Sequence, residues 1–318
     1  MQAVVDVVLP VFGLILVGYL AGRFRILGQE SSEALNNFVY FFALPALLFV
    51  GMARVSAQDV LNLPFLAAFL GGIFIVFVLA LVVARFAFPG NGAARTLGAL
   101  SAVFANTGYM GIPLFLTAFG PDGVLPAVIG AVAMAAIVMA AGVVMIELAF
   151  SAGSGFVKAL ANVGRAVALN PLVIASVAGF VWNAAGFGLP KPIATFADLL
   201  GAAAGPAALF AIGLFLASQS LNALMGGRRA VEVVWLLSLK LVVQPLVTWW
   251  IARLVGLDQF WTASAVILSA LPTGALIFVL ARQYGVYVER ASAVILASTV
   301  VSVVTLSAIM VLLRPTGP

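Results

Sequence analysis

The sequence predicts an all-α integral membrane protein with ten transmembrane helices, arranged as two inverted five-helix repeats. Three observations predict this fold: a very apolar composition, ten apolar runs of membrane-spanning length, and an internal duplication. Of the 318 residues, 64% are hydrophobic and 8% are charged, and the mean hydropathy is +1.24. This number of charged residues is too small to cover a water-soluble surface. The composition therefore requires a lipid bilayer as the solvent.

The apolar runs are each about 20 residues long, which matches the roughly 30 Å hydrocarbon core of a bilayer. They cover residues 4–22, 36–53, 64–84, 96–118, 125–148, 166–186, 196–218, 231–253, 261–282 and 290–313. The first run lacks the basic segment that precedes a cleavable signal, so we expect it to remain as a helix. We therefore divide the chain into a first repeat (1–150), a short connector (151–165) and a second repeat (166–318).

The duplication is visible as matched motifs around prolines. Pro45-Ala46-Leu47-Leu48-Phe49 recurs 161 positions later as Pro206-Ala207-Ala208-Leu209-Phe210, and Pro10 with Gly18 recurs at the same offset as Pro171 with Gly179. Each unit holds five predicted helices. Because five is an odd number, the second unit must enter the membrane in the opposite orientation. Inverted copies of one unit are typical of secondary transporters.

The basic residues are divided unequally between the two sides of the predicted membrane. The loops after helices 1, 3, 5, 7 and 9 carry ten of the fifteen, namely Arg23, Arg25, Arg85, Arg95, Lys158, Arg165, Arg228, Arg229, Arg282 and Arg290. The opposite side carries Arg54, Lys191, Arg253 and Arg314. The positive-inside rule then places the odd-numbered loops in the cytoplasm and both termini outside, in a bacterial plasma (inner) membrane. This charge is a topology signal, so we expect no nucleic-acid partner.

The fourth and ninth runs carry polar and helix-breaking residues at mid-depth. The fourth contains Asn106-Thr107-Gly108 followed by Pro113, and the ninth contains Pro272-Thr273-Gly274. Proline suits the first position of a new helix, so we expect both helices to break and to cross at mid-membrane, with their new N-termini directed inward. Such N-termini attract anions. Proline and glycine also serve ordinary helix packing, but the matched positions and Asn106 favour a binding site.

Lys240 lies near the middle of the eighth run, one turn before Gln244. A charged side chain at that depth costs about 3 kcal/mol on insertion scales, so it indicates a function or a specific partner. Two interpretations stay open: an anion-attracting or gating charge, or a tether to a carboxylate or to carbonyls at a broken helix end. The sequence contains no histidine or cysteine and no clear mid-membrane carboxylate. It therefore predicts no catalytic group, metal site or cofactor, and no dedicated sodium cage or proton relay.

Two segments resemble motifs of the auxin efflux carrier family of membrane transporters. They are residues 35–49 (LNNFVYFFALPALLF) and residues 106–114 (NTGYMGIPL), and weaker likeness extends over the whole chain, including residues 281–285. The resemblance implies the ten-helix fold shared with bile-acid:sodium symporters. In that fold helices 1, 2, 6 and 7 form a scaffold, and helices 3–5 and 8–10 form a transport unit whose fourth and ninth helices are unwound and cross.

The resemblance also implies an organic-anion cargo: auxin in plant members, and dicarboxylates such as malate or malonate in some bacterial ones. Asn106 corresponds to the crossover asparagine that contacts the cargo carboxylate. The plant exporters have a long hydrophilic loop where this chain has residues 151–165, so auxin itself is not expected.

We therefore expect a carrier that is not an enzyme and that moves a small organic anion by elevator-type or rocking alternating access, without a co-ion. The expected substrate-binding residues are Asn106, Thr107, Gly108, Pro113, Pro272, Thr273 and Gly274, with Lys240 and Gln244 as charge or gating residues. The alternatives are a sodium-coupled, bile-acid-like symporter and a non-transporting membrane sensor. A homodimer is an open question at this point.

Overall fold

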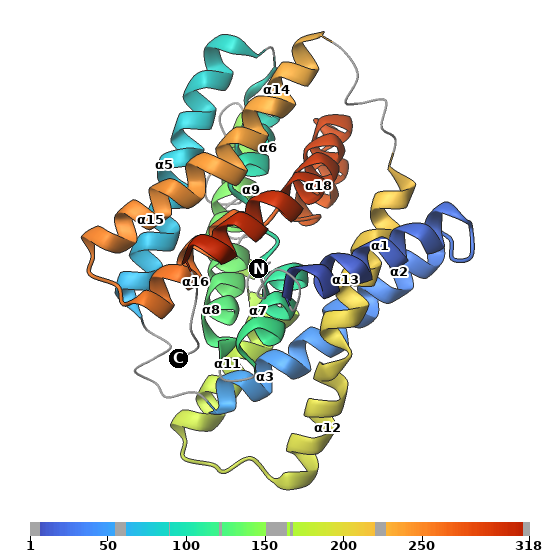
Figure 1. The fold of residues 1–318 in the computed structure, drawn as a ribbon, viewed down its shortest axis with the longest axis vertical. Helices are drawn as coiled ribbons and strands as arrows, with labels where there is room; N and C mark the ends of the chain where they lie inside the picture. Colours follow the sequence, from blue (N-terminus) through green and yellow to red (C-terminus); the bar gives the residue numbers. More distant parts are fainter. Residues whose placement is uncertain are drawn as a thin grey trace.

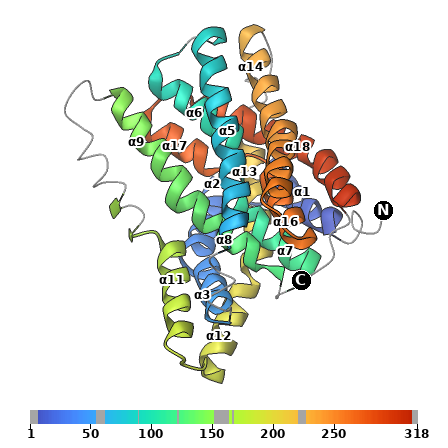
Figure 2. The ribbon, with the colours of Figure 1, turned by 90° about the vertical axis from the view of Figure 1, so that its left-hand side faces the viewer.

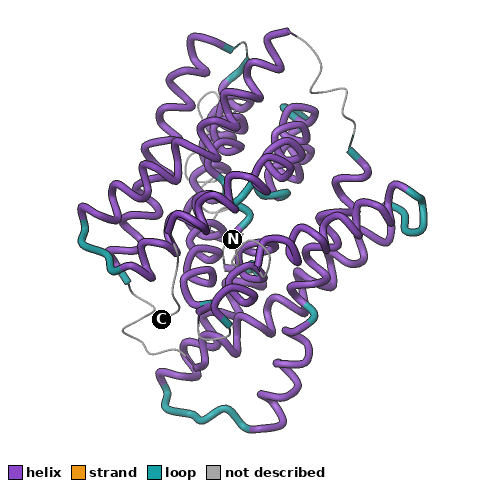
Figure 3. The backbone as a smooth tube through the Cα atoms, viewed as in Figure 1, coloured by secondary structure: helices purple, strands orange, loops and turns teal. Residues whose placement is uncertain are grey.

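The computed structural model describes residues 7–54, 62–88, 90–120, 123–150, 164–165, 168–219 and 227–313. These parts of the chain are helices and loops, with no β-strand among them (Figure 3). Both termini and residues 151–163 of the predicted connector lie outside the described residues. The division into two repeats at the connector therefore stays a prediction.

Each predicted apolar run coincides with one helix or with consecutive helices. The first half contains α1 (Leu9–Arg23), α2 (Gln29–Phe38), the π-helix η2 (Val39–Ala43), α3 (Leu44–Arg54), α5 (Leu63–Ala87), α6 (Gly92–Val103), η3 (Thr107–Gly111), α7 (Ile112–Phe119), α8 (Leu125–Ala133), η5 (Met134–Val138) and α9 (Met139–Phe150). The second half contains α11 (Pro171–Ala184), α12 (Lys191–Ala202), α13 (Ala204–Ser218), α14 (Gly227–Ser238), η7 (Leu239–Val243), α15 (Gln244–Leu254), α16 (Gln259–Ala270), α17 (Leu276–Tyr284) and α18 (Val288–Leu313).

Five of the described helical segments are long and apolar enough to cross a membrane. They are Glu30–Arg54, Leu63–Ala87, Lys191–Ser218, Gly227–Leu254 and Val288–Leu313. Shorter apolar helices accompany them, among them α1 and α11. The all-helical, multi-pass character predicted from composition is thus confirmed, while the number of ten spans and their inverted arrangement stay predictions.

The helices form two groups, which Figure 1 separates well. In one group α1 packs along α13, α3 packs along α11 and α12, and α2 lies against α13. In the other group α5 contacts α6, α15 and α16, while α6 contacts α9 and α14 contacts α18. The view in Figure 2 shows α3, α11 and α12 together at one end of the molecule. We call these the α1/α13 group and the α5/α15 group.

The α1/α13 group is held together at matched glycines. A Cβ atom on Gly18 would overlap the carbonyl oxygen of Phe210, and one on Gly179 would overlap the carbonyl oxygen of Phe49. Because glycine lacks a Cβ, α1 meets α13 and α11 meets α3 through direct backbone contact. Gly18 and Gly179 occupy equivalent positions of the duplication, and so do Phe49 and Phe210. Equivalent residues in the two halves therefore make equivalent contacts.

Three prolines follow π-helical turns. Pro45, Pro113 and Pro245 each lie two residues after such a turn, η2, η3 and η7 respectively. A proline ring displaces the carbonyl of the preceding turn and lacks an N–H group, and a wider π-turn accommodates this loss. Pro113 therefore lies inside a continuous helix that starts at Thr107. The expectation that Pro113 opens the new half-helix is wrong for this reason.

Candidate functional site

Two helix interruptions lie directly against each other at residues 104–106 and 271–275. The Asn106 N–H donates to the Pro272 carbonyl, and the Gly274 N–H donates to the Phe104 carbonyl, each at 2.9 Å. Ala105 and Thr273 form an isolated antiparallel bridge between the two segments. A break in an apolar helix leaves backbone groups without partners, and here the two breaks satisfy each other.

Thr273 completes this pairing with its side chain. Its hydroxyl donates to the Ser101 carbonyl at 2.7 Å, and its N–H donates to the Ser298 hydroxyl at 3.1 Å. Ser101 lies near the end of α6, where the break has removed a normal intrahelical donor. Thr273 is only 1% exposed, so its hydroxyl stabilises the interruption and does not face an open space. Pro272 lies within the interruption, where its carbonyl accepts the Asn106 N–H. Helix α17 begins only at Leu276, so Pro272 is not in its first turn.

Lys240 and Gln244 connect the ends of the two broken helices. The Lys240 Nζ donates to the Ser269 carbonyl at 2.6 Å and to the Gln244 Oε1 at 2.8 Å. The Gln244 Nε2 in turn donates to the Val103 carbonyl at 3.2 Å. Both side chains are fully buried. Val103 ends α6 and Ser269 lies in the last turn of α16, so this geometry is the one that the tether interpretation expects.

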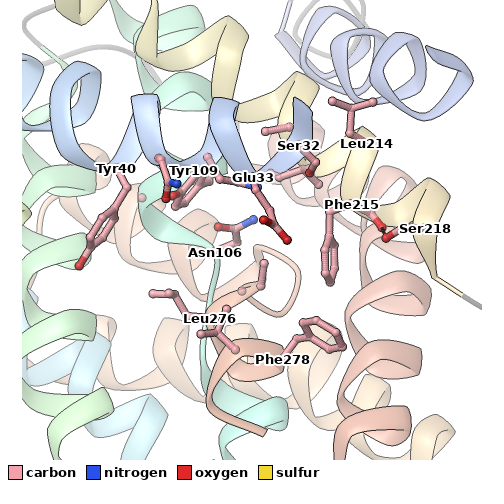
Figure 4. Close-up of a pocket in the computed structure, with 18 of the residues that line it drawn as sticks. Ser32, Glu33, Tyr40, Asn106, Tyr109, Leu214, Phe215, Ser218, Leu276 and Phe278 are labelled. Carbon is pink, nitrogen blue, oxygen red and sulfur yellow. Dashed lines mark hydrogen bonds between the residues drawn. The ribbon is translucent and has the colours of Figure 1, made fainter. Parts of the chain in front are cut away.

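A cavity of about 790 Å³ lies on one side of the paired interruptions. Four of the predicted site residues line it: Asn106, Thr107, Gly108 and Gly274. Figure 4 shows the Asn106 amide directed into this space, between residues of α2 above and α17 below. The other predicted residues, Pro113, Pro272, Thr273, Lys240 and Gln244, do not line it. Pro113 lies instead against Gly205 of α13.

The cavity wall also contains the first turns of two helices. Gly108 and Tyr109 lie in the first turn of the helix that begins at Thr107, and Leu276 begins α17. First-turn N–H groups have no acceptor within their own helix, and they carry the positive end of the helix dipole. The N–H groups of Met110, Ile277 and Phe278 already donate to nearby carbonyls, so this part of the cavity offers a ligand the Asn106 amide and the positive ends of two helix dipoles. A carboxylate supplies the matching acceptors.

Sequence reasoning missed a polar face of α2 and the adjoining η2 that forms the opposite wall. Glu33, Asn36, Asn37 and Tyr40 all line the cavity. Their spacing of three and four residues is that of a single helix face, and this periodicity is the signal that could have found them. Arg282 of α17 also lines the cavity, with its guanidinium 6.0 Å from the centre of the Phe278 ring. The cavity thus receives one carboxylate and one guanidinium from the described part of the chain.

Comparison with known proteins identifies the family. The family described as membrane transport protein matches residues 3–310. The chain belongs to this family. It is 34% identical over 316 residues to the Rhizobium meliloti protein named "Putative malonate transporter", which covers 99% of this chain and 97% of the relative.

Two further relatives, at lower identity, extend the comparison. An uncharacterized transporter of Methanothermobacter thermautotrophicus is 28% identical over 95% of both chains. Auxin efflux carrier component 8 of Arabidopsis thaliana is 24% identical over 90% of both chains. The resemblance to auxin efflux carriers is therefore confirmed, and the chain is a membrane transporter of this family.

Proposed function

We propose that this transporter is a carrier of a small organic anion and holds the cargo carboxylate at the paired interruptions. The observation that carries the proposal is the convergence of the Asn106 amide and two helix N-termini on one cavity. The name of the Rhizobium meliloti relative supports malonate, a small dicarboxylate, as the first compound to test. Arg282 offers the same cavity a guanidinium that can pair with a carboxylate, while the Glu33 carboxylate balances its formal charge.

The position of the cavity supports elevator-type alternating access. Its wall comes partly from the α1/α13 group, through α2 and residues 211–219, and partly from residues 104–109 and 274–282. A cargo bound at Asn106 therefore lies at the boundary between two bodies. Movement of the interrupted segments along the α1/α13 group would carry the site from one side of the membrane to the other.

We also propose the predicted topology of ten spans, with both termini outside the cytoplasm of a bacterial inner membrane. The chain contains no cysteine, so single cysteines report on topology without background. Gly90 precedes α6 in a predicted cytoplasmic loop, and Gly188 lies in the predicted external loop between α11 and α12. A membrane-impermeant maleimide should label Gly188→Cys in intact cells, and Gly90→Cys only after the cells are opened. Labelling of both from one side would contradict the topology.

Flux in proteoliposomes tests the proposed transport. We expect saturable uptake of radiolabelled malonate that continues when potassium replaces sodium, with protein-free liposomes as the control. Strict dependence on sodium would favour the symporter alternative. Binding without flux in a correctly folded protein would favour the sensor alternative and overturn the carrier proposal.

A further inference from the structure

A second, much smaller hollow lies between α5, α6, α14 and the start of α18, and it shares no lining residue with the cavity beside Asn106. Its volume is about 10 Å³, which holds roughly one water-sized group. The charged and indole side chains of its lining are Arg95, Glu232, Trp235 and Arg290. Figures 1 and 2 both show α5 ending and α14 beginning at the same end of the molecule. The positive-inside rule predicts that this end faces the cytoplasm.

Two donors in this lining lack an acceptor. The Nε–H of Arg95 on α6 and the indole Nε1–H of Trp235 on α14 are both buried, and neither donates a hydrogen bond to a described residue. A buried donor without an acceptor is costly, and few groups in native proteins stay in that state. The two N–H groups therefore favour a ligand that brings acceptor atoms to the hollow.

The charges of the lining indicate the sign of that ligand. The Glu232 carboxylate is already engaged, because one oxygen accepts from the Tyr287 hydroxyl at 2.6 Å and the other from the Arg290 guanidinium at 3.0 Å. Glu232 and Arg290 thus balance each other, whereas Arg95 forms no ion pair with a described residue. A water molecule could accept from the two free donors, but it would leave the Arg95 charge without a counter-charge. An anion supplies both the acceptors and the charge.

We propose that this hollow binds the headgroup phosphate of an anionic phospholipid. One phosphate oxygen has the size of the single group that the hollow admits, and it accepts hydrogen bonds from Arg95 and Trp235. The planar guanidinium of arginine matches the geometry of phosphate oxygens. The rest of the headgroup lies at the mouth of the hollow, because the space is too small for a whole phosphate.

The helices that form the hollow also offer a surface for the acyl chains. Phe86 in the last turn of α5 is 84% exposed, and Val231 in the first turns of α14 is 62% exposed. Two further arginines, Arg85 and Arg228, are exposed on the same helix ends. Apolar side chains below a basic helix end suit a lipid with an anionic headgroup, and the cytoplasmic leaflet is the one rich in such lipids. This site does not depend on the proposed cargo.

Thermal unfolding of the purified full-length protein in a neutral detergent tests the site. Phosphatidylglycerol, phosphatidylcholine and inorganic phosphate are added separately, since a ligand that binds the folded state raises the melting temperature. For wild type we expect a rise with phosphatidylglycerol that clearly exceeds the rise with phosphatidylcholine, and none with inorganic phosphate. Arg95→Gln should need about tenfold more phosphatidylglycerol for the same rise, because it loses a charged hydrogen bond. Trp235→Phe should show a smaller loss, and the control Arg253→Gln, at the predicted external end, should match wild type.

Each variant is compared with its own lipid-free protein, so a change in basal stability does not obscure the result. Equal responses of wild type and Arg95→Gln to phosphatidylglycerol would overturn the proposal. A rise with inorganic phosphate as large as that with phosphatidylglycerol would identify a site for soluble anions and overturn the assignment to a lipid.

Fluorescence quenching in vesicles provides a second, direct measurement. The chain contains no cysteine, so Val231→Cys carries a single fluorophore beside the hollow. In mixed vesicles of phosphatidylcholine and phosphatidylglycerol, only one of the two lipids is brominated at a time. We expect stronger quenching by brominated phosphatidylglycerol at equal mole fraction, and loss of this preference when Arg95→Gln is added. Equal quenching by both lipids before that substitution would contradict the proposal and leave the carrier function untouched.

Discussion

The interruptions at residues 104–106 and 271–275 share their backbone arrangement but differ in what their side chains do. Each contributes one N–H and one carbonyl to the two hydrogen bonds that join them. In the first interruption the Asn106 amide lines the cavity. In the second, the Thr273 hydroxyl donates to the Ser101 carbonyl and does not reach the cavity. Both interruptions thus pair through their backbones in the same way, while the Asn106 amide lines the cavity and the Thr273 hydroxyl is a buried support.

The helices beside the two interruptions differ in the same way. Helix α5 of the first half runs without interruption for 25 residues, and its interior carries no charged side chain. Its counterpart in the second half, from α14 to α15, contains the π-turn η7 and the Lys240–Gln244 pair that reaches both broken helix ends. Side chains of the second half therefore satisfy backbone carbonyls at the broken helix ends of both halves.

Replacing Lys240 should have the largest effect on this asymmetric support. In Lys240→Met the Ser269 carbonyl and the Gln244 side-chain oxygen lose their common donor, and two such bonds contribute about 1–3 kcal/mol. We expect a clearly lower melting temperature in detergent. Lys191→Met, at an exposed lysine that begins α12, is the matched control and should melt like wild type. Unchanged stability with selective loss of charged cargo would instead support the anion-attracting interpretation of Lys240.

Asn106→Ala and Thr273→Val test the contrast between the two interruptions directly. Loss of the Asn106 amide should weaken malonate binding roughly tenfold to a hundredfold, or about 1.5–3 kcal/mol, with little change in melting temperature. Thr273→Val should instead lower stability by about 1–3 kcal/mol, because the Ser101 carbonyl becomes buried without a donor. Titration calorimetry and thermal unfolding of both variants separate the effects. Similar behaviour of the two variants would refute the division of roles.

Gly18→Ala and Gly179→Ala test the matched backbone contacts, in which the two halves are alike. Each new methyl group would overlap a backbone carbonyl of the facing helix, and such overpacking costs about 1–3 kcal/mol or more. Gly13→Ala on α1 is the control, because a Cβ there meets no atom within 4 Å. Similar destabilisation at both matched sites would support two copies of one unit. A large loss at one site and none at the other would contradict an equivalent role in packing.

Much of the backbone arrangement could be predicted from the sequence. Glycine, proline and polar residues within apolar runs located both interruptions, because these residue types weaken a helix at their own positions. The start of the half-helix at Thr107 was not predictable in the same way. It depends on Asn106 donating to Pro272, a residue far away in the chain, and this pairing ends the break well before Pro113.

The polar residues of the cavity illustrate the other limit. Asn106 was predicted because an amide within an apolar run is costly and conspicuous. Glu33 was missed because it precedes the apolar part of its helix, where a carboxylate is ordinary. Its position in the cavity follows from the packing of α2 on α13 and beside the interrupted segment, which no local pattern encodes.

The sequence by itself determined that this chain is helical, belongs in a membrane, contains matched motifs and weakens two of its helices at matched positions. These are local properties, since hydropathy and helix propensity depend on neighbouring residues along the chain. Only the tertiary structure decided which polar groups face the cavity and which serve the backbone. Gln244 reaches a carbonyl 141 positions away and Thr273 one 172 positions away. A carbonyl released by a broken helix takes whichever donor the packing brings to it, because it cannot stay unpaired in an apolar interior.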